Sequence, residues 1–463
     1  MDKRAAIPVT LPRENPTQSY WQLGPDEIAD MRSTTSLPEK AEVVIIGSGI
    51  TGAAMAYNLL ESGTRDIVML EARQACSGAT GRNGGHTKAA SYLLFLENEK
   101  HYGTALAVKI ARLELANVRA VHAFAREHEI DCDSHPCETV DVVYDATRWE
   151  FDQRVVKAMQ DAMPSDDASI YAIHNAQETR SKFFCGREGD EGVCGALSYE
   201  AGSLSSYKFT IGVLKLCLKR GLNLQTNTPA LNLEKLEGGG WKIETPNGSI
   251  LAQRVVLATN AYTAKIWKKF QGVIVPLRGH VTAQRPGSNV PKDLAGSYSF
   301  FSEKGYDYMI RRPEGTKYEG DIVIGGSLSK AVADGLEEYG TTDDTALNED
   351  IVKALEESLP IYFGDNWGED DRRGRIRNAW TGIMGYSPDG FPFVGEVPGE
   401  KDLWVSAGFQ GNGMVLCWMC ARALMIMMND RPGEVGKLDS WFPEVYKITE
   451  GRLRLAFKGR LRN

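Results

Sequence analysis

The sequence predicts an α/β protein in which a domain with a parallel sheet is combined with an α+β domain whose sheet is mainly antiparallel. Three observations predict this fold. A buried strand, residues 43–46, runs into a glycine-rich turn that opens a helix. A second glycine-rich strand-to-helix turn follows near the other end of the chain, at residues 408–413, and residues 272–330 between them hold several short β-like runs. One parallel domain assembled from separated segments, with a second domain built from the insertions, explains this order.

The first turn has the spacing Gly47-x-Gly49-x-x-Gly52, and a second apolar run, residues 67–70, ends in Glu71. This pattern predicts a Rossmann-like dinucleotide site, because Gly49 lets the backbone approach a pyrophosphate and Gly52 lets helix and strand pack closely. Amide groups at the helix start then face the phosphates, and Glu71 accepts the ribose hydroxyls. A ligand-free turn of the same shape is the alternative. The candidate cofactor-binding residues here are Gly47, Ser48, Gly49, Ile50, Thr51, Gly52, Glu71, Ala72 and Arg73.

The composition is that of a soluble globular protein. The chain has 463 residues, 42% of them hydrophobic and 25% charged, with a net charge of −8 and a pI near 5.6. The negative charge argues against nucleic acid or an anionic membrane as a partner, and no apolar run is long enough to span a bilayer. Eight cysteines show no disulfide or zinc spacing, and Cys417-x-x-Cys420 lies in an apolar helical run that favours a buried helix over redox chemistry. No signal-peptide core precedes the domain, so we expect a cytoplasmic protein.

The predicted organisation alternates the two domains along the chain. Residues 1–40 read as an extended, proline-rich arm anchored by Tyr20 and Trp21. The Rossmann-like domain comprises residues 41–97, 196–270 and 366–435, the substrate domain residues 98–195 and 271–365, and residues 436–463 form a tail. Helices are expected over about 98–128, 150–162, 205–220, 347–359 and 414–428, and Asn247-Gly248 predicts a hairpin.

The chain resembles the D-amino-acid oxidase family of FAD-dependent oxidoreductases, which includes glycine and sarcosine oxidases and γ-glutamylputrescine oxidoreductases. Four blocks carry the resemblance: residues 43–71, 77–86, 255–263 and 380–414. The element Gly81-Arg82-Asn83-Gly84-Gly85 most resembles the γ-glutamylputrescine oxidoreductase branch. The resemblance implies a glutathione-reductase-like FAD domain and oxidation of the carbon next to an amine nitrogen. A hydride passes to flavin N5, the resulting imine is hydrolysed by water, and O2 or another acceptor takes the electrons.

The later blocks supply the rest of the implied FAD site. Gly408, Gly411 and Gly413 allow a backbone to approach the flavin ring closely, whereas Arg73 and Arg82 either neutralise phosphate or lie at the surface. Sarcosine oxidases attach the flavin through a cysteine at the position of Met384, so we expect noncovalent FAD here. The lysine those enzymes place after the second turn is missing, since Met414 and Val415 follow Gly413. The candidate cofactor-binding residues of these blocks are Gly78, Ala79, Thr80, Arg82, Asn83, Gly84, Gly85, His86, Ala258, Thr259, Asn260, Gly408, Gln410, Gly411, Asn412, Gly413 and Met414.

Candidates for orienting the substrate come from three places. His86 closes the glycine-rich loop and could accept a hydrogen bond or a proton, and His280 starts a strand expected to cross the substrate side. Tyr306 and Tyr308 share one face of a predicted strand, and Arg311 could bind a carboxylate. Each of these side chains could instead be structural. No metal site is evident.

Three functional hypotheses follow from these motifs. The leading one is an FAD-dependent oxidoreductase acting on a small amine or amino acid. An NAD-linked dehydrogenase would use the first glycine turn alone, but residues 408–413 argue against it. A catalytically altered flavin-binding or assembly protein stays open, because the carboxylate clamp is missing.

Overall fold

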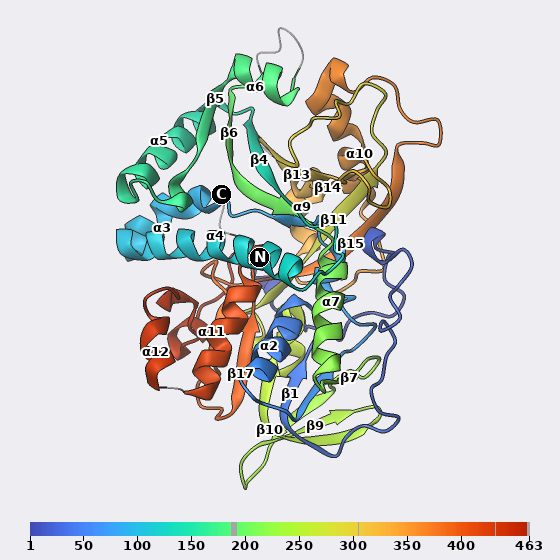
Figure 1. Ribbon diagram of the computed structural model, residues 1–463, viewed down its shortest axis with the longest axis vertical. Coiled ribbons are helices and arrows are strands. Elements are labelled where there is room, and N and C mark those ends of the chain that lie inside the picture. The colour runs from blue at the N-terminus through green and yellow to red at the C-terminus, as the bar shows by residue number, and fades with distance from the viewer. Residues whose placement is uncertain (187–191, 304, 431, 461–463) are drawn as a thin grey trace.

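The computed structural model describes residues 1–186, 192–303, 305–430 and 432–460, and it contains two large sheets, one in each half of Figure 1. The first sheet has the order β16-β17-β10-β1-β2-β7. Its four central pairs are parallel, while β16 and the hairpin strand β9 run antiparallel. Its strands are β1 (Lys40–Ile46), β2 (Ile67–Leu70), β7 (Asn223–Gln225), β8 (Asn232–Lys235), β9 (Trp241–Thr245), β10 (Gly248–Leu257), β16 (Phe393–Glu396) and β17 (Leu403–Ala407).

Residues 43–46 of strand β1 are all apolar because both faces of the strand are covered there. Val43 and Ile45 pack into the cluster formed with the helices α2 (Ile50–Glu61), α7 (Ser206–Lys219) and α11 (Cys417–Asn429). Val44 and Ile46 pack on the opposite side, against the hairpin residues. Continuous apolar strands are typical of a parallel sheet that is buried on two faces, and Figure 1 shows the three helices lying together on one face of β1 and β17.

The second sheet has the order β15-β11-β14-β13-β12-β4-β6-β3, with β5 paired to β6. Among the described strands of this second sheet, only the β4–β12 pair is parallel. The prediction of a mainly antiparallel sheet is therefore confirmed. Its strands are β3 (His86–Thr87), β4 (His135–Val143), β5 (Ala172–Asn175), β6 (Gly195–Ser203), β11 (Val275–Gln284), β12 (Ser297–Ser302), β13 (Gly305–Arg311), β14 (Ile322–Gly326) and β15 (Ile376–Tyr386).

Helices cover this sheet on both sides. The helix α10 (Glu349–Phe363) packs on the face that carries Tyr298, Met309 and Ile324. At the far end of the other face lie α3 (Phe95–Tyr102), α4 (Thr104–Glu127) and α5 (Ala146–Ala162), and α6 (Ala176–Phe183) joins β5 to β6. The short helices are α1 (Asp2–Ala5), α8 (Thr263–Ile266), α9 (Val332–Gly335), α12 (Pro432–Leu438) and α13 (Glu450–Leu453).

The expected helices and strands agree with the structure apart from their ends. The apolar helix near the second glycine turn begins at Cys417 instead of Met414, because Gly413–Val415 forms a separate 3₁₀ turn. The domain division by residue number stays a prediction. No helix in the described part of the chain is long and apolar enough to cross a membrane.

The N-terminal arm contains one helical turn at its start and a 3₁₀ turn, Tyr20–Gln22, and it runs along the body of the molecule (Figure 1). Its predicted anchors are buried: Tyr20 is 5% and Trp21 8% exposed. The Tyr20 ring stacks on Trp380 of β15 with a centroid distance of 6.1 Å. The arm therefore reaches the second sheet.

Candidate functional site

The glycine-rich turn after β1 leads directly into α2. Gly47 has φ 107°, and a Cβ there would lie 2.6 Å from the carbonyl oxygen of Ala258. A Cβ on Gly52 would overlap the carbonyl of Gly47, so both positions require glycine. The N-cap residue Gly49 offers no side-chain cap. The amide of Ile50 donates to Thr80 Oγ1, and the amides that follow it receive no cap from Gly49 and can bind an acceptor from a ligand.

Glu71 lies at the end of β2, directly beside this turn. Its Oε2 accepts hydrogen bonds from Ser48 N (3.0 Å) and Ser48 Oγ (2.6 Å), and its Oε1 accepts one from Arg73 N (3.0 Å). The carboxylate is thus fixed next to the helix start. This is the place where a dinucleotide's ribose lies in a Rossmann-like domain.

The loop of residues 77–86 packs against the same turn and extends to the second sheet. Thr80 Oγ1 accepts a hydrogen bond from Ile50 N at 3.1 Å. At the other end, Gly84 lies so close to Tyr308 that a Cβ would come within 2.5 Å of its ring. The loop therefore links the start of α2 to the second sheet.

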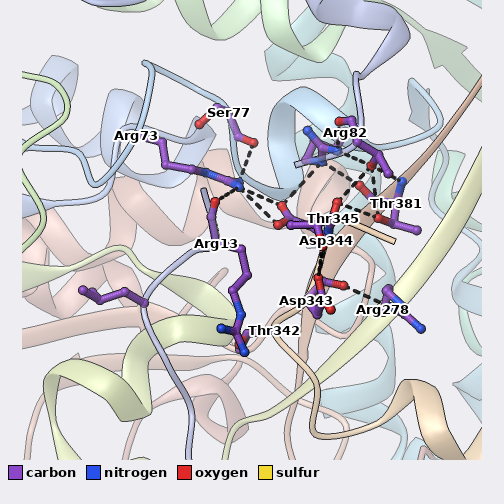
Figure 2. A network of polar contacts seen from close by, with 12 residues as sticks. Arg13, Arg73, Ser77, Arg82, Arg278, Thr342, Asp343, Asp344, Thr345 and Thr381 are labelled. Carbon is purple, nitrogen blue, oxygen red and sulfur yellow. Dashed lines mark hydrogen bonds and ion pairs between the residues drawn. The ribbon is translucent and has the colours of Figure 1, made fainter. Parts of the chain in front are cut away.

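Arg73 and Arg82, the predicted phosphate partners, are both held by protein groups. Arg73 Nη1 pairs with Asp344 Oδ2 at 2.9 Å, and Nη2 donates to Ser77 O at 3.1 Å. Arg82 is only 3% exposed, and its Nε donates to Thr381 O at 2.6 Å. Burial lowers the pKa of Arg82 to about 10, which the carboxylate of Asp344 partly offsets. Figure 2 shows both guanidinium groups converging on Asp344.

The second glycine loop, residues 408–414, is fastened from three sides. Asn260 Oδ1 accepts hydrogen bonds from Gly408 N (3.0 Å) and Phe409 N (3.3 Å), and Gln410 N donates to Gly385 O at 2.9 Å. Asn117 of α4 donates through Nδ2 to Met414 O at 3.0 Å.

Met384 lies beside this loop, because a Cβ on Gly411 would be 3.3 Å from its sulfur. Thr259, Asn412 and Gly413 belong to the same junction of loops, at the ends of β10 and β17.

Alternation along β13 decides which side chains lie on the face of the second sheet opposite α10. Tyr306 and Tyr308 lie on one face, with ring centroids 5.7 Å apart, and Tyr308 pairs with Ser299 of β12. Arg311 has the opposite parity, and its Nη1 donates to Pro291 O at 3.1 Å. The structure therefore brings the two tyrosines together but not Arg311.

His86 joins the two tyrosines on this face. Its ring centroid lies 5.2 Å from that of Tyr308, edge to face. Within the described ranges neither ring nitrogen has a hydrogen-bond partner, although both are buried. Burial, with the nearby charge of Lys88, lowers the pKa of His86 to about 3, so the ring is neutral at physiological pH.

His280 lies elsewhere. Val281 of β11 pairs with Gly325, which in turn pairs with Tyr308, so His280 occupies the other face of the sheet. Its Nε2 accepts a hydrogen bond from Asn348 N, at the start of α10, at 2.9 Å. Burial lowers its pKa to about 4. The histidine therefore orients α10 and does not join the tyrosines.

A buried ion pair that sequence reasoning missed lies on the tyrosine face. The Nζ of Lys88 pairs with Asp141 Oδ1 and donates to Ser299 Oγ. Asp141 Oδ2 accepts from Tyr92 OH (2.9 Å) and Tyr199 OH (2.7 Å). Lys88 lies just after the two-residue strand β3, His86–Thr87, and no local pattern in the sequence marks it as a site residue. Nothing local in the sequence points to Asp141.

These features fit a dinucleotide whose ring reaches the second sheet. The start of α2 and Glu71 form one end, and the loop of residues 77–86, where side chains on Gly84 or Gly85 would clash, forms the other together with the second glycine loop. His86, whose ring nitrogens have no partner among the described residues, contacts Tyr308 on the tyrosine face.

Comparison with known proteins identifies the family of the chain. Residues 42–425 match the DAO family model, described as FAD dependent oxidoreductase. Probable oxidoreductase OrdL of Rhizobium meliloti is 27% identical over 83% of this chain and 82% of its own length. The gamma-glutamylputrescine oxidoreductase of Escherichia coli is 21% identical over 92% of this chain and 91% of its own. The crystal structure of glycine oxidase from Geobacillus kaustophilus superposes with a TM-score of 0.69 at 17% identity, covering 89% of this chain and 99% of that one.

The chain belongs to the DAO family of FAD-dependent oxidoreductases, because the family model matches most of its length. The predicted family, fold class and FAD cofactor are thereby confirmed. The match also confirms the prediction of a flavin-dependent enzyme over the NAD-linked alternative.

Proposed function

We propose that this protein oxidises a C–N bond of a small amine or amino acid with noncovalently bound FAD. One observation supports this most directly. Two glycine loops, far apart in the sequence, approach the same face of the second sheet, where His86 contacts Tyr308. A planar ring between these loops would lie against a surface of neutral hydrogen-bonding groups.

The proposed cofactor contacts follow from the geometry. The amides at the start of α2 would bind the pyrophosphate, Glu71 the ribose, and the loops 77–86 and 408–414 the two sides of the ring. Met384 adjoins Gly411, and a thioether cannot form the covalent link that a cysteine makes. When bound, FAD supplies an acceptor for the hydride at N5 and returns the electrons to O2 or another acceptor.

The chain's own residues would bind and orient the substrate. Burial raises the pKa of both Tyr306 and Tyr308, so each keeps its hydroxyl proton and can donate a hydrogen bond. His86 stays neutral and can accept a hydrogen bond from the substrate amine. This favours the neutral amine, which releases a hydride more readily than an ammonium group. The imine product would then be hydrolysed by water.

Two measurements test the proposal. The absorption spectrum of the purified protein is recorded before and after acid precipitation, and the flavin bands are expected to move into the supernatant. Anaerobic titration with a panel of amines and amino acids is then expected to bleach the flavin. Flavin left in the pellet would contradict noncovalent binding. A protein that binds FAD but is reduced by none of the panel would instead favour the altered flavin-binding protein.

The cellular location is part of the same proposal. All eight cysteines are free thiols, which is typical of proteins in a reducing compartment. The cytoplasm stays our prediction, and fractionation of cells that express the protein tests it.

A further inference from the structure

The N-terminal arm contacts the loop that carries much of the proposed FAD site. Ser19 Oγ donates to Gly81 O at 2.6 Å, and Trp21 Nε1 donates to Asn83 O, also at 2.6 Å. Both donors are buried. The match to the family model begins at residue 42, so the arm's side of these contacts lies before the residues that the family model matches.

The arm is itself held by hydrogen bonds to Asp344 and to β15. Thr17 N donates to Asp344 O at 2.8 Å, and Thr381 N donates to Thr17 Oγ1 at 3.0 Å. The carboxylate of Asp344 pairs with Arg73, and the guanidinium of Arg82 donates to Thr17 Oγ1 at 2.7 Å. Figure 2 shows this network from close by. The arm and both arginine-bearing loops are therefore joined by one network of hydrogen bonds and ion pairs.

These contacts fix three consecutive carbonyl groups of the loop. Gly81 O and Asn83 O accept from the arm, and Arg82 O accepts from Trp380 Nε1 at 2.8 Å. The loop has only one short 3₁₀ turn, Ala79–Arg82, and little secondary structure to order it. Its other end holds the amide of Ile50 through Thr80. The same loop that is held at these carbonyls therefore also contacts the start of α2, through the hydrogen bond between Thr80 and Ile50.

We propose that residues 13–21, here called the strap, are a built-in part of the cofactor site. The strap holds residues 81–83 in the conformation that binds FAD, with Thr17, Ser19, Trp21 and Asp344 as positioning residues. Without it the loop would sample other conformations, and the apparent affinity for FAD would fall with the fraction of molecules that are competent to bind. This inference rests on the proposed function, since it takes FAD as the ligand.

The test compares two strap variants with a matched control in the full-length protein. Trp21→Phe removes the indole donor but keeps a ring at that place, and Ser19→Ala removes one hydroxyl. Thr10→Ala removes a hydroxyl from the same arm, one that bonds Thr342 Oγ1 at 2.6 Å and not the loop. The dissociation constant for FAD is measured by titrating each deflavinated protein and following flavin fluorescence. The melting temperature is recorded with and without FAD.

We expect each strap variant to raise the dissociation constant about tenfold, because a buried acceptor loses its partner, and Thr10→Ala to leave it unchanged. The rise in melting temperature on adding FAD should shrink in the strap variants. If the melting temperature without FAD falls while the dissociation constant stays at the wild-type value, the strap is only structural and the inference is wrong. If Trp21→Phe does not fold, Ser19→Ala decides alone. A wild-type protein that binds no FAD would instead overturn the proposed function.

Discussion

The substitution Glu114→Gln should make the protein more stable at alkaline pH without changing it in acid. Glu114 lies on α4, and its Oε2 accepts a hydrogen bond from Ser91 Oγ. Burial raises the pKa of this carboxyl to about 7 from an ordinary value of 4.5. Tyr171 and Tyr446 are the titratable side chains that its charge would affect. Glutamine has nearly the same shape, stays neutral, and can still accept from Ser91.

The magnitude follows from the pKa difference between the folded and unfolded chains. Below pH 4.5 both forms are protonated and the group contributes no pH dependence. Between pH 4.5 and 7 the unfolded chain ionises while the folded one keeps its proton, so stability falls as pH rises. A difference of about 2.5 pKa units corresponds to about 3 kcal/mol, at 1.36 kcal/mol per unit. The variant should therefore gain about 3 kcal/mol over the wild type at pH 8, and nothing at pH 4.

Urea unfolding midpoints at pH 4.5 and pH 8 measure this difference. Glu127→Gln is the matched control, since it removes one carboxylate from an exposed position at the end of the same helix and should change stability by less than about 0.5 kcal/mol. A variant that gains nothing at pH 8, or that loses stability equally at both pH values, would refute the reasoning. Glu114 also lies one turn before Asn117, which holds Met414 O, so its ionisation acts close to the second glycine loop.

Two further substitutions test the proposed site. Asn260→Ala leaves the amides of Gly408 and Phe409 without their acceptor and should weaken FAD binding about tenfold; Asn247→Ala, in the distant hairpin, is the control, and equal affinity in both would contradict the role of Asn260. Gly84→Ala places a Cβ 2.5 Å from the Tyr308 ring and should lower kcat/KM at least about tenfold by displacing the tyrosine. The control Gly238→Ala meets no atom within 4 Å, and unchanged turnover in both variants would show that the position of Tyr308 does not matter.

Local patterns predicted the parts of the molecule that depend on local geometry. The turn at Gly47 and the acid at Glu71 could be recognised because a strand, a glycine spacing and a second strand occur within one short segment. Alternation on β13 predicted the shared face of Tyr306 and Tyr308, and the same rule applied to Arg311 would have placed it on the other face. The sequence did contain this information.

Contacts between distant segments could not be predicted in this way. Asp344 is part of the site through its pairing with Arg73, 271 residues away, and neither residue lies in a pattern that names the other. His280 was expected at the substrate side because its strand crosses the sheet, but a strand has two faces and only the pairing with β14 decides between them. The sequence thus predicts which loops bind the cofactor better than it predicts what holds those loops.

The nature of the strap contacts explains how such support can come from residues that precede the part matched by the family model. Ser19 and Trp21 bind backbone carbonyls, and every residue at positions 81–83 would offer the same acceptor. The contacts of Ser19 and Trp21 therefore do not depend on which side chains positions 81 and 83 carry. Side-chain contacts such as those of Arg73 with Asp344 and of Arg82 with Thr17 lack this freedom, because each partner requires the other. The cofactor site of this chain accordingly combines a shared glycine framework with a brace that binds both the backbone of the loop and the side chain of Arg82.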